Sequence, residues 1–262
     1  MRMIRQSSVL LAAAIASFAS EPPPLRDLVA KAAEYYQARQ SVAANFTHAE
    51  SLRNQNFDSH GKKTLDISDT FEITILEGAP YYRHTGHNGK PHSPRENQKE
   101  EEKMRNVATQ RRAGDRAAGI YPHGVNIALP IADLPNFDLH ASGEATLDGR
   151  RAYVIDAVPS ARFIANASAD PLAKASRMRL WIDEQDTQFA KIRAEVVQAG
   201  TRYRPGVVIE ADYEKVRDEV WLMKQFHFKG EVLEGSHFVL AEAEQHCYDF
   251  RKFAAESKIV IQ

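Results

Sequence analysis

Between residues 177 and 230 the sequence alternates apolar and polar residues over several neighbouring segments, and it shows no helical period. The alternating segments are 177–182, 191–196, 207–213 and 220–228. Successive side chains of a strand point to opposite faces, so a period of two is typical of strands that bury one face. Short polar segments such as 183–186 suit the turns between them. The stretch therefore predicts an antiparallel meander with one apolar face and one solvated face.

Two helices are predicted outside this meander. Residues 25–40 carry apolar side chains at three- and four-residue spacing, which is typical of an amphipathic helix. Ser93, Pro94 and Glu96 form a helix start, with an N-cap serine, a proline at the first helical position and a glutamate three residues after the cap. The helix that follows has few apolar residues, so we expect it on the surface as a charged insertion at about 93–113.

The same alternation predicts further strands on both sides of these elements. They span 44–52, 63–76, 80–85, 137–147, 151–158, 235–240, 243–253 and 258–261, whereas 163–176 is predicted to be a long loop. Many strands with few helices favour the α+β class. We expect one domain over residues 20–262, built as a strongly curved antiparallel β-sheet with helices covering its concave face. A curved sheet of this size either closes into a barrel or leaves an apolar trough. Helices that fill such a hollow incompletely leave an apolar cavity for a ligand.

The N-terminus has the pattern of a secretory signal peptide. A basic start with Arg2 and Arg5 precedes a short apolar run at 9–16. Ser17 and Ala19 place small residues at the positions that a signal peptidase reads. The apolar run is too short for a permanent membrane anchor, and a frayed N-terminal helix is the alternative. We expect residues 1–19 to be cleaved on export and the remaining chain to be periplasmic.

Charge and cysteine content exclude some classes of function. The formal net charge of −1 offers no basic field, so nucleic acid is not expected as a partner. The one cysteine, Cys247, cannot form an internal disulfide and lies in an alternating segment. We expect it to be a small buried residue rather than a nucleophile.

No motif for catalysis or cofactor binding is present in the sequence. It lacks a metalloprotease histidine pair, a nucleophile elbow, a phosphate-binding glycine loop and a dinucleotide fingerprint. His84, His87 and His92 lie within nine residues, and the spacing of the first two suits a metal ion. No acid or cysteine completes a recognisable ligand set, so these histidines are interpreted as part of a loop beside the turn at 88–89. We predict a non-enzymatic protein without a cofactor or a metal site.

Motifs along most of the chain resemble the LolA-like superfamily of periplasmic proteins, which includes the lipoprotein carrier LolA, the receptor LolB and the regulator RseB. Besides the signal peptide and the first helix, these motifs lie at 46–50, 71–76, 88–91, 147–153, 179–183, 220–222 and 248–253. The resemblance implies an incomplete antiparallel barrel closed by helices around an apolar cavity that holds acyl chains. The sequence departs from the family pattern in its long charged helix and in an extra loop near Phe163.

This resemblance and the apolar strand faces predict a periplasmic, non-enzymatic carrier or chaperone for the acyl chains of lipids or lipoproteins. The residues expected to line the cavity are Phe71, Ile73, Ile75, Leu180, Ile182, Ile192, Val196, Ile209, Tyr213, Leu222 and Phe226. Ordinary packing against the first helix is the alternative for each of them.

Two other functions stay open. One is an RseB-like regulator that senses a lipidated or protein partner through the same fold. The other is an enzyme whose residues are scattered among loops. The partners expected are lipid or lipoprotein acyl chains and a protein of the outer or inner membrane.

Overall fold

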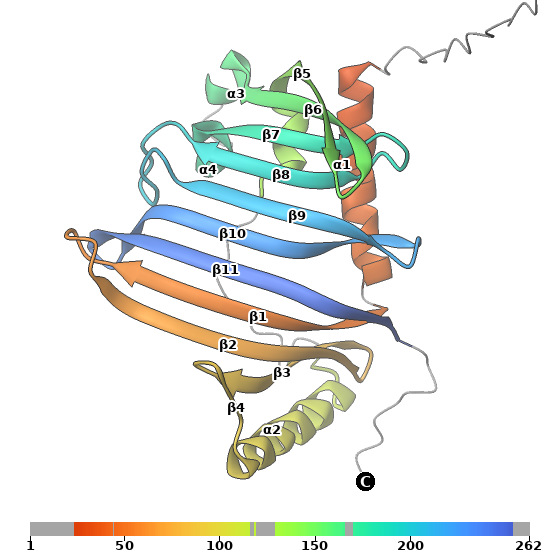
Figure 1. Cartoon of the computed structure of the whole chain (residues 1–262), viewed down its shortest axis with the longest axis vertical. Helices are drawn as coiled ribbons and strands as arrows, with labels where there is room; N and C mark the ends of the chain where they lie inside the picture. Colours follow the sequence, from red (N-terminus) through yellow and green to blue (C-terminus); the bar gives the residue numbers. More distant parts are fainter. Residues whose placement is uncertain (1–23, 44, 116–117, 119–128, 166–169, 254–262) are drawn as a thin grey trace, which may run out of the picture.

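The sheet dominates the structure, a computed structural model that describes residues 24–43, 45–115, 118, 129–165 and 170–253 (Figure 1). These residues contain one sheet of eleven strands in the order β4-β3-β2-β1-β11-β10-β9-β8-β7-β6-β5. The strands are β1 (Phe46–Phe57), β2 (Lys63–Leu76), β3 (Ala79–His87), β4 (Lys90–Pro91), β5 (Phe137–Leu147), β6 (Arg150–Pro159), β7 (Ser176–Asp183), β8 (Phe189–Val196), β9 (Val208–Val216), β10 (Val220–Glu234) and β11 (His237–Lys252). All neighbouring strands are antiparallel.

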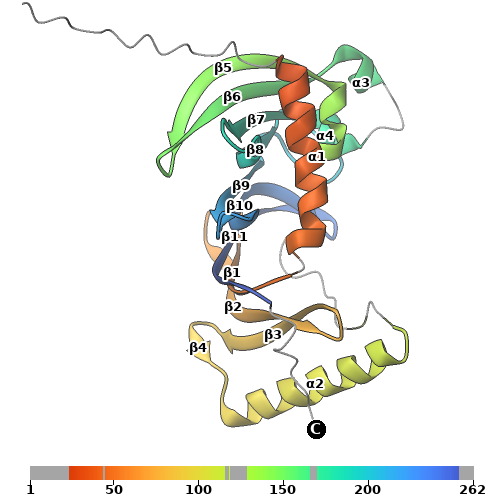
Figure 2. The same cartoon turned by 90° about the vertical axis from the view of Figure 1, so that its right-hand side faces the viewer.

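Two meanders meet in the middle of this sheet. One runs from β1 outwards to β4, and the other runs from β5 to β11. β1 pairs with β11 along its length, with Leu52 opposite Gln245. The outermost strands β4 and β5 do not pair with each other, so the curved sheet stays open (Figure 2). The predicted fold class, an α+β protein with an incomplete antiparallel barrel, is confirmed.

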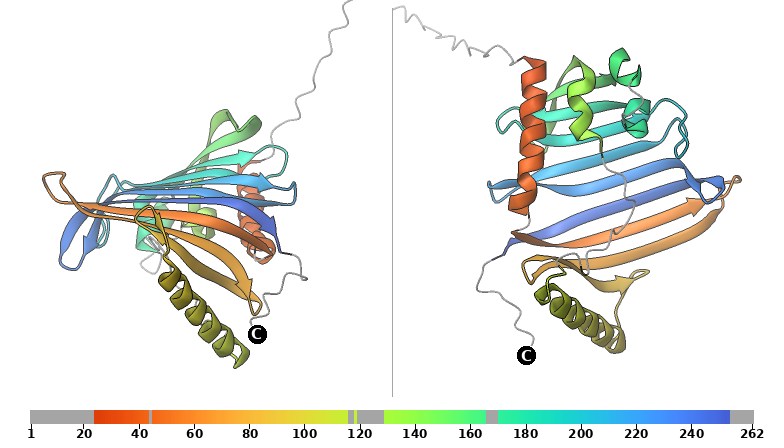
Figure 3. Two further views of the ribbon diagram at one scale, coloured as in Figure 1. Left: turned by 60° about the horizontal axis from the view of Figure 1, so that its bottom comes forward. Right: turned by 180° about the vertical axis from the view of Figure 1, so that it is seen from behind.

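Helical elements cover one face of the half of the sheet formed by β5–β10 (Figure 3). They are α1 (Leu25–Ala43), the 3₁₀ helix η1 (Ile131–Asn136), α3 (Ala161–Ala165) and α4 (Pro171–Ala175). α1 contacts η1, β5 and β10, and α4 contacts β6 and β7. Val29 and Ala32 of α1 are buried in the same core as Ile192 and Ile209 of the sheet. The helical spacing of α1 and the alternation of the strands therefore converge on one apolar layer.

The charged helix α2 (Pro94–Arg112) begins at a capping box, as predicted. The Glu96 N–H donates to the Ser93 hydroxyl, and the Glu96 carboxylate accepts the Ser93 N–H at 2.7 Å. Met104, Val107 and Ala108 pack with Tyr81 of β3, so the helix is attached to the sheet edge. Most of its surface is exposed, as expected for a charged insertion.

Two charged residues of α2 are buried, which its composition does not predict. The Glu100 carboxylate accepts the Tyr81 hydroxyl proton at 2.7 Å. The Arg111 guanidinium donates to backbone carbonyls around the turn between β2 and β3. Hydrogen bonds to these groups offset the loss of hydration that burial imposes.

A bulge between Met223 and Gln225 of β10 changes which side chains reach the core. Met223 pairs with Tyr213, whereas Leu222 pairs with Glu214 and so lies on the opposite face. Leu222 packs there with Phe46, Val216 and Val220. The expectation of one apolar face throughout 220–228 is therefore wrong, because a bulge adds a residue and shifts the alternation.

Other segments differ from the prediction in smaller ways. The expected loop at 163–176 contains α4 and the end of α3, and the two strands expected at 235–240 and 243–253 form the single strand β11. The expected signal peptide and the strand at 258–261 lie outside the described residues. None of the helices within the described ranges combines the length and the hydropathy that a membrane-spanning segment requires.

Candidate functional site

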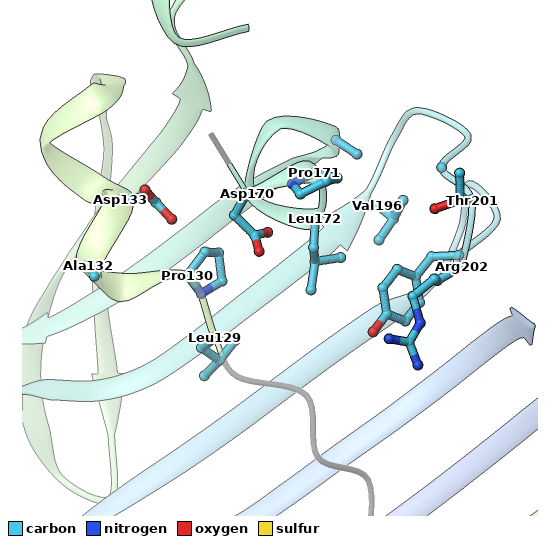
Figure 4. Close-up of a pocket in the computed structure, with 13 residues that line it drawn as sticks. Leu129, Pro130, Ala132, Asp133, Asp170, Pro171, Leu172, Val196, Thr201 and Arg202 are labelled. Carbon is cyan, nitrogen blue, oxygen red and sulfur yellow. The ribbon is translucent and has the colours of Figure 1, made fainter. Parts of the chain in front are cut away.

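A pocket of about 520 Å³ lies on the helix-covered face, between η1, α4 and the loop that joins β8 to β9 (Figure 4). Its lining residues are Leu129, Pro130, Ala132, Asp133, Asp170, Pro171, Leu172, Ala175, Val196, Gly200, Thr201, Arg202 and Tyr203. The volume lies within the range of small-molecule pockets, about 300–1,000 Å³.

Short-range hydrogen bonds hold the α4 wall of the pocket. The Asp170 carboxylate caps α4 by accepting the Ala173 N–H at 2.9 Å. At the other end of the helix, the Ser176 hydroxyl donates to the Leu172 carbonyl at 2.7 Å. Pro171 at the first helical position has the φ angle that a helix start needs. The Leu172 side chain is thereby held towards the pocket (Figure 4).

Backbone hydrogen bonds to α4 and to the sheet hold the opposite wall. The Val197 N–H donates to the Ala175 carbonyl at 2.7 Å, which ties the start of the β8–β9 loop to α4. The Leu233 N–H donates to the Arg202 carbonyl at 2.9 Å, which ties the tip of the loop to β10. The pocket walls therefore come from three segments that are distant in sequence.

The pocket has an apolar interior and a polar rim. Leu129, Leu172 and Val196 point into it, while Asp133 and Arg202 approach from opposite sides (Figure 4). Burial, together with the charge of Asp170, raises the pKa of the Asp133 carboxyl. Among the described residues of the lining there is no histidine, cysteine or lysine that would form a nucleophile–base pair. This arrangement suits a ligand with an apolar body and a polar end.

Of the predicted lining residues, Val196 reaches this pocket. Val196 shares the main core with six others of the set, namely Leu180, Ile182, Ile192, Ile209, Tyr213 and Phe226. All seven are buried in a core that also contains side chains of α1, η1 and α4. The structure therefore brings this part of the predicted set together as a packed layer beside the pocket.

The remaining predicted residues lie elsewhere. Phe71 and Ile73 form a smaller buried cluster with Leu52 on β1 and β2, and Ile75 is half-buried near the end of β2. Leu222 lies on the other face of the sheet, as its pairing with Glu214 shows. The apolar residues of the pocket that the sequence analysis missed, such as Leu172, belong to a segment interpreted as loop. A signal was present there, since Asp170 and Pro171 have the pattern of a helix start.

A buried acid on the β1–β11 part of the sheet was also missed. Glu50 is buried and pairs with Phe71 of β2 and Cys247 of β11. Burial raises the pKa of the Glu50 carboxyl to about 7, although a hydrogen bond from the Gln245 side chain acts in the opposite direction. Burial also lowers the pKa of the neighbouring His48 to about 4 and raises that of Cys247 to about 12. The buried, inert cysteine that the sequence predicts agrees with this environment.

Glu50→Gln is expected to change how stability depends on pH. Because the folded-state pKa of Glu50 lies above its unfolded value, the folded protein loses stability as pH rises from about 4.5 through 7. The amide cannot ionise, so at pH 8 the variant should be more stable than wild type by up to about 3 kcal/mol. The difference should vanish near pH 4. Urea unfolding at several pH values measures it.

Glu72→Gln is the matched control for this prediction, because Glu72 lies next to Phe71 on the opposite, solvated face and pairs with Arg83 at 3.1 Å. The free energy of unfolding of Glu72→Gln should differ from that of wild type by at most about 1 kcal/mol at any pH. Equal pH profiles for wild type and Glu50→Gln would show that folding does not shift the pKa of Glu50.

Comparison with known proteins finds similarity of structure only. No family model matches the sequence, and no curated protein sequence matches it. A domain described as outer membrane lipoprotein-sorting, from Vibrio parahaemolyticus, is 10% identical with a TM-score of 0.37, covering 85% of this chain and 92% of that one. A LolA superfamily protein from Nitrosomonas europaea is 8% identical with a TM-score of 0.33, covering 87% and 93%.

The MucA/MucB complex of Pseudomonas aeruginosa contains a third similar chain, 12% identical with a TM-score of 0.24, covering 86% of this chain and 100% of that one. The similar structures include proteins of the superfamily that the sequence motifs resemble. The domain from Vibrio parahaemolyticus is named for lipoprotein sorting, and the structure from Pseudomonas aeruginosa is a complex of MucA with MucB.

Proposed function

We propose that this protein binds the acyl chain of a lipid or lipoprotein in the pocket between η1, α4 and the β8–β9 loop, as a non-enzymatic carrier or chaperone. The observation that carries the proposal is an apolar pocket of about 520 Å³ whose charged groups, Asp133, Asp170 and Arg202, lie among its rim residues. The predicted signal peptide supports a periplasmic location.

The physical basis is the transfer of methylene groups out of water. Each buried methylene contributes about 0.8 kcal/mol, so a chain that places eight of them in the pocket gains roughly 6 kcal/mol before the cost of its ordering. Such a ligand needs apolar walls and few directional contacts, which is what Leu129, Pro130 and Leu172 provide. A polar head at the rim would meet Asp133 and Arg202.

The sheet residues of the main core that were predicted to line a cavity lie beside the proposed binding pocket. Ile192 and Ile209 lie in the packed layer next to Val196. They would reach a ligand only if η1 or α4 moved away from the sheet. The pocket as it stands is therefore the entry point, and the predicted lining would extend it.

Leu172→Trp is expected to weaken binding of a fluorescent palmitate analogue by at least about tenfold. The larger side chain fills the pocket without adding charge, and the half-buried position allows the protein to stay folded. Fluorescence titration of the purified protein measures the dissociation constant, and circular dichroism checks the fold.

Leu65→Trp is the control, since Leu65 is also half-buried but lies on β2, outside the pocket. It should bind palmitate as wild type does. Equal weakening in both variants, or no binding by wild type, would contradict the proposal. A wild-type protein that binds no acyl chain but holds a stable protein partner would instead support the regulator.

A further inference from the structure

Three side chains of metal-ligand type converge at the edge of the sheet, away from the pocket. His84 Nε2 and His87 Nδ1, both on β3, lie 2.9 Å and 2.7 Å from the same oxygen, Asp69 Oδ1 of β2. Each of the three atoms lies within 4.8 Å of the others. The acid that is missing beside the histidines in the sequence is thus supplied by the neighbouring strand.

A β-bulge is what aims both imidazoles at one carboxylate. Residues three apart in a regular strand point to opposite faces. Here Asp69 pairs with His87 and Phe71 pairs with His84, so β3 has one residue more than β2 between the two pairs. The extra residue turns the two histidines to the same side, and bulges commonly redirect side chains in this way at functional sites.

Close backbone packing holds the bulge in place. Gly86 lies between the two histidines, and a Cβ there would be 2.7 Å from the Lys90 carbonyl oxygen and 2.8 Å from Thr70 Oγ1. Only glycine allows β2, β3 and β4 to approach one another so closely. Asn88 and Gly89 then reverse the chain with positive φ angles of 51° and 72°.

The histidine rings are also fixed by their neighbours. Phe71 stacks on His84 with ring centroids 5.0 Å apart, and His92 meets the same ring edge-on at 4.5 Å. The Asn88 side-chain nitrogen lies 2.9 Å from His87 Nε2. Ligands of metal sites are typically oriented by such secondary contacts.

A second observation comes from His92. Its Nδ1 atom is buried and has no hydrogen-bond partner among the described residues. An unpartnered buried polar atom destabilises the fold, and this one lies on the ring that touches His84. A third imidazole with an unused nitrogen therefore lies beside the cluster.

From these contacts we propose that Asp69, His84 and His87 bind a divalent transition-metal ion of the Zn²⁺ class. Two imidazole nitrogens and one carboxylate oxygen form a donor set that suits Zn²⁺, Cu²⁺ or Ni²⁺ better than Mg²⁺ or Ca²⁺. The ion replaces the protons that each ring donates to Asp69. Ligand atoms around tetrahedral zinc are about 3.3 Å apart, so the observed 2.7 and 2.9 Å contacts must open by about half an ångström, a small side-chain movement.

The site is open to solvent, so a bound ion can exchange. The side chains of Asp69, His84 and His87 are 21%, 27% and 51% exposed, so an ion enters from solvent and water occupies its remaining position. On binding, the proton of His87 moves to Nε2, and the Asn88 amide must turn over to accept it. That rotation releases the present contact between Asn88 Oδ1 and the Ser68 N–H.

Two other clusters with ligand-type residues fit less well. His48, Glu50 and Cys247 are close together, but Glu50 and Cys247 are buried and hold protons that an ion would have to displace. In the cluster of His227, Glu242 and Glu244, the Glu242 carboxylate already pairs with Lys229 at 3.4 Å.

Calorimetric titration of zinc chloride into untagged, EDTA-treated protein tests the site. We expect one equivalent to bind, and His87→Ala and Asp69→Asn each to weaken binding by at least about tenfold. His87 is half-exposed, so its removal leaves the fold intact. His60→Ala, which removes an exposed histidine from the β1–β2 turn, should bind zinc as wild type does.

Cobalt(II) absorption in the same proteins reports the donor set. A tetrahedral spectrum that is present in wild type and His60→Ala but absent in His87→Ala would support the assignment. A weaker tetrahedral spectrum in His92→Ala would indicate that His92 is a further ligand. Absence of binding to wild type, or equal zinc affinity in wild type and His87→Ala, would overturn it. Asp69 would then only hold the two rings by hydrogen bonds.

Discussion

Asp183→Ala is expected to lower the free energy of unfolding by about 3 kcal/mol, the lower end of the range for removing one partner of a buried ion pair, because Arg150 is half-buried and keeps Asp186 as a second partner. Asp183 is 1% exposed, and its two carboxylate oxygens accept Arg150 Nε and Nη2 at 2.7 and 2.8 Å. The backbone N–H groups of Gln185 and Asp186 donate to the same carboxylate at 3.1 and 2.8 Å. Alanine leaves Arg150 Nε and the two backbone N–H groups without this acceptor, whereas Arg150 Nη2 keeps its contact with Asp186 Oδ2 at 2.8 Å.

The pKa of Asp183 also shows that its hydrogen bonds favour the charged carboxylate. Burial acts to raise it, but the hydrogen bonds from Arg150 and from the Asp186 backbone outweigh burial, and the pKa is lowered. A carboxyl group whose folded-state pKa is depressed stabilises the protein above its unfolded pKa and loses that contribution as pH falls. The effect of Asp183→Ala should therefore be largest at neutral pH and shrink in acid.

Asp156→Ala is the matched control, because Asp156 forms the same two-pronged contact with Arg179 at 2.6 and 3.0 Å on the solvated face. With 35% and 48% of these side chains exposed, the loss should be at most about 1 kcal/mol. Urea unfolding monitored by circular dichroism measures both variants. Equal losses would mean that burial adds nothing to the Asp183 contact.

Arg111→Ala is expected to cost about 4 kcal/mol and to detach α2 from the sheet. The buried guanidinium donates to the carbonyl oxygens of Leu76, Ala79, Pro80 and Ala118 at 2.7–2.9 Å. Hydrogen bonds from a charged donor contribute about 1.5–3 kcal/mol each, and partial hydration of the freed carbonyls reduces the total. α2 has few apolar contacts to replace them.

Hydrogen exchange followed by mass spectrometry distinguishes local unfolding of α2 from unfolding of the whole protein. In Arg111→Ala the amides of α2 should exchange rapidly, while those of β9 and β10 stay protected. Arg112→Ala serves as control, because Arg112 is exposed and pairs with Glu77 at 2.7 Å; α2 should keep its protection. Unchanged protection in both variants would show that apolar packing alone holds the helix.

Several features were predictable because they depend on local geometry. The side chains of a strand alternate whatever their surroundings, so 177–182 and 191–196 were assigned to strands with the correct core face. The capping box at Ser93 satisfies backbone donors within a few residues, so the start of α2 was predicted at the right position. Spacing of apolar residues likewise located α1.

The candidate sites depend on contacts between distant residues, and the sequence signals for them were weak. The pocket joins η1, α4 and the β8–β9 loop, none of which has a strong periodic pattern. Asp69 is fifteen positions from His84 and eighteen from His87, and the bulge in β3 turns both histidines to its side. The bulge in β10 similarly moved Leu222 away from the predicted cavity.

By itself the sequence determined most of the strands, the two long helices and the α+β class, because alternation and helical spacing are set by the backbone of each segment. Only the tertiary structure decided which loops enclose the pocket, which acid meets the histidines and which charges are buried. Those outcomes follow from strand register and from bulges, where a shift of one residue reverses the direction of every side chain that follows.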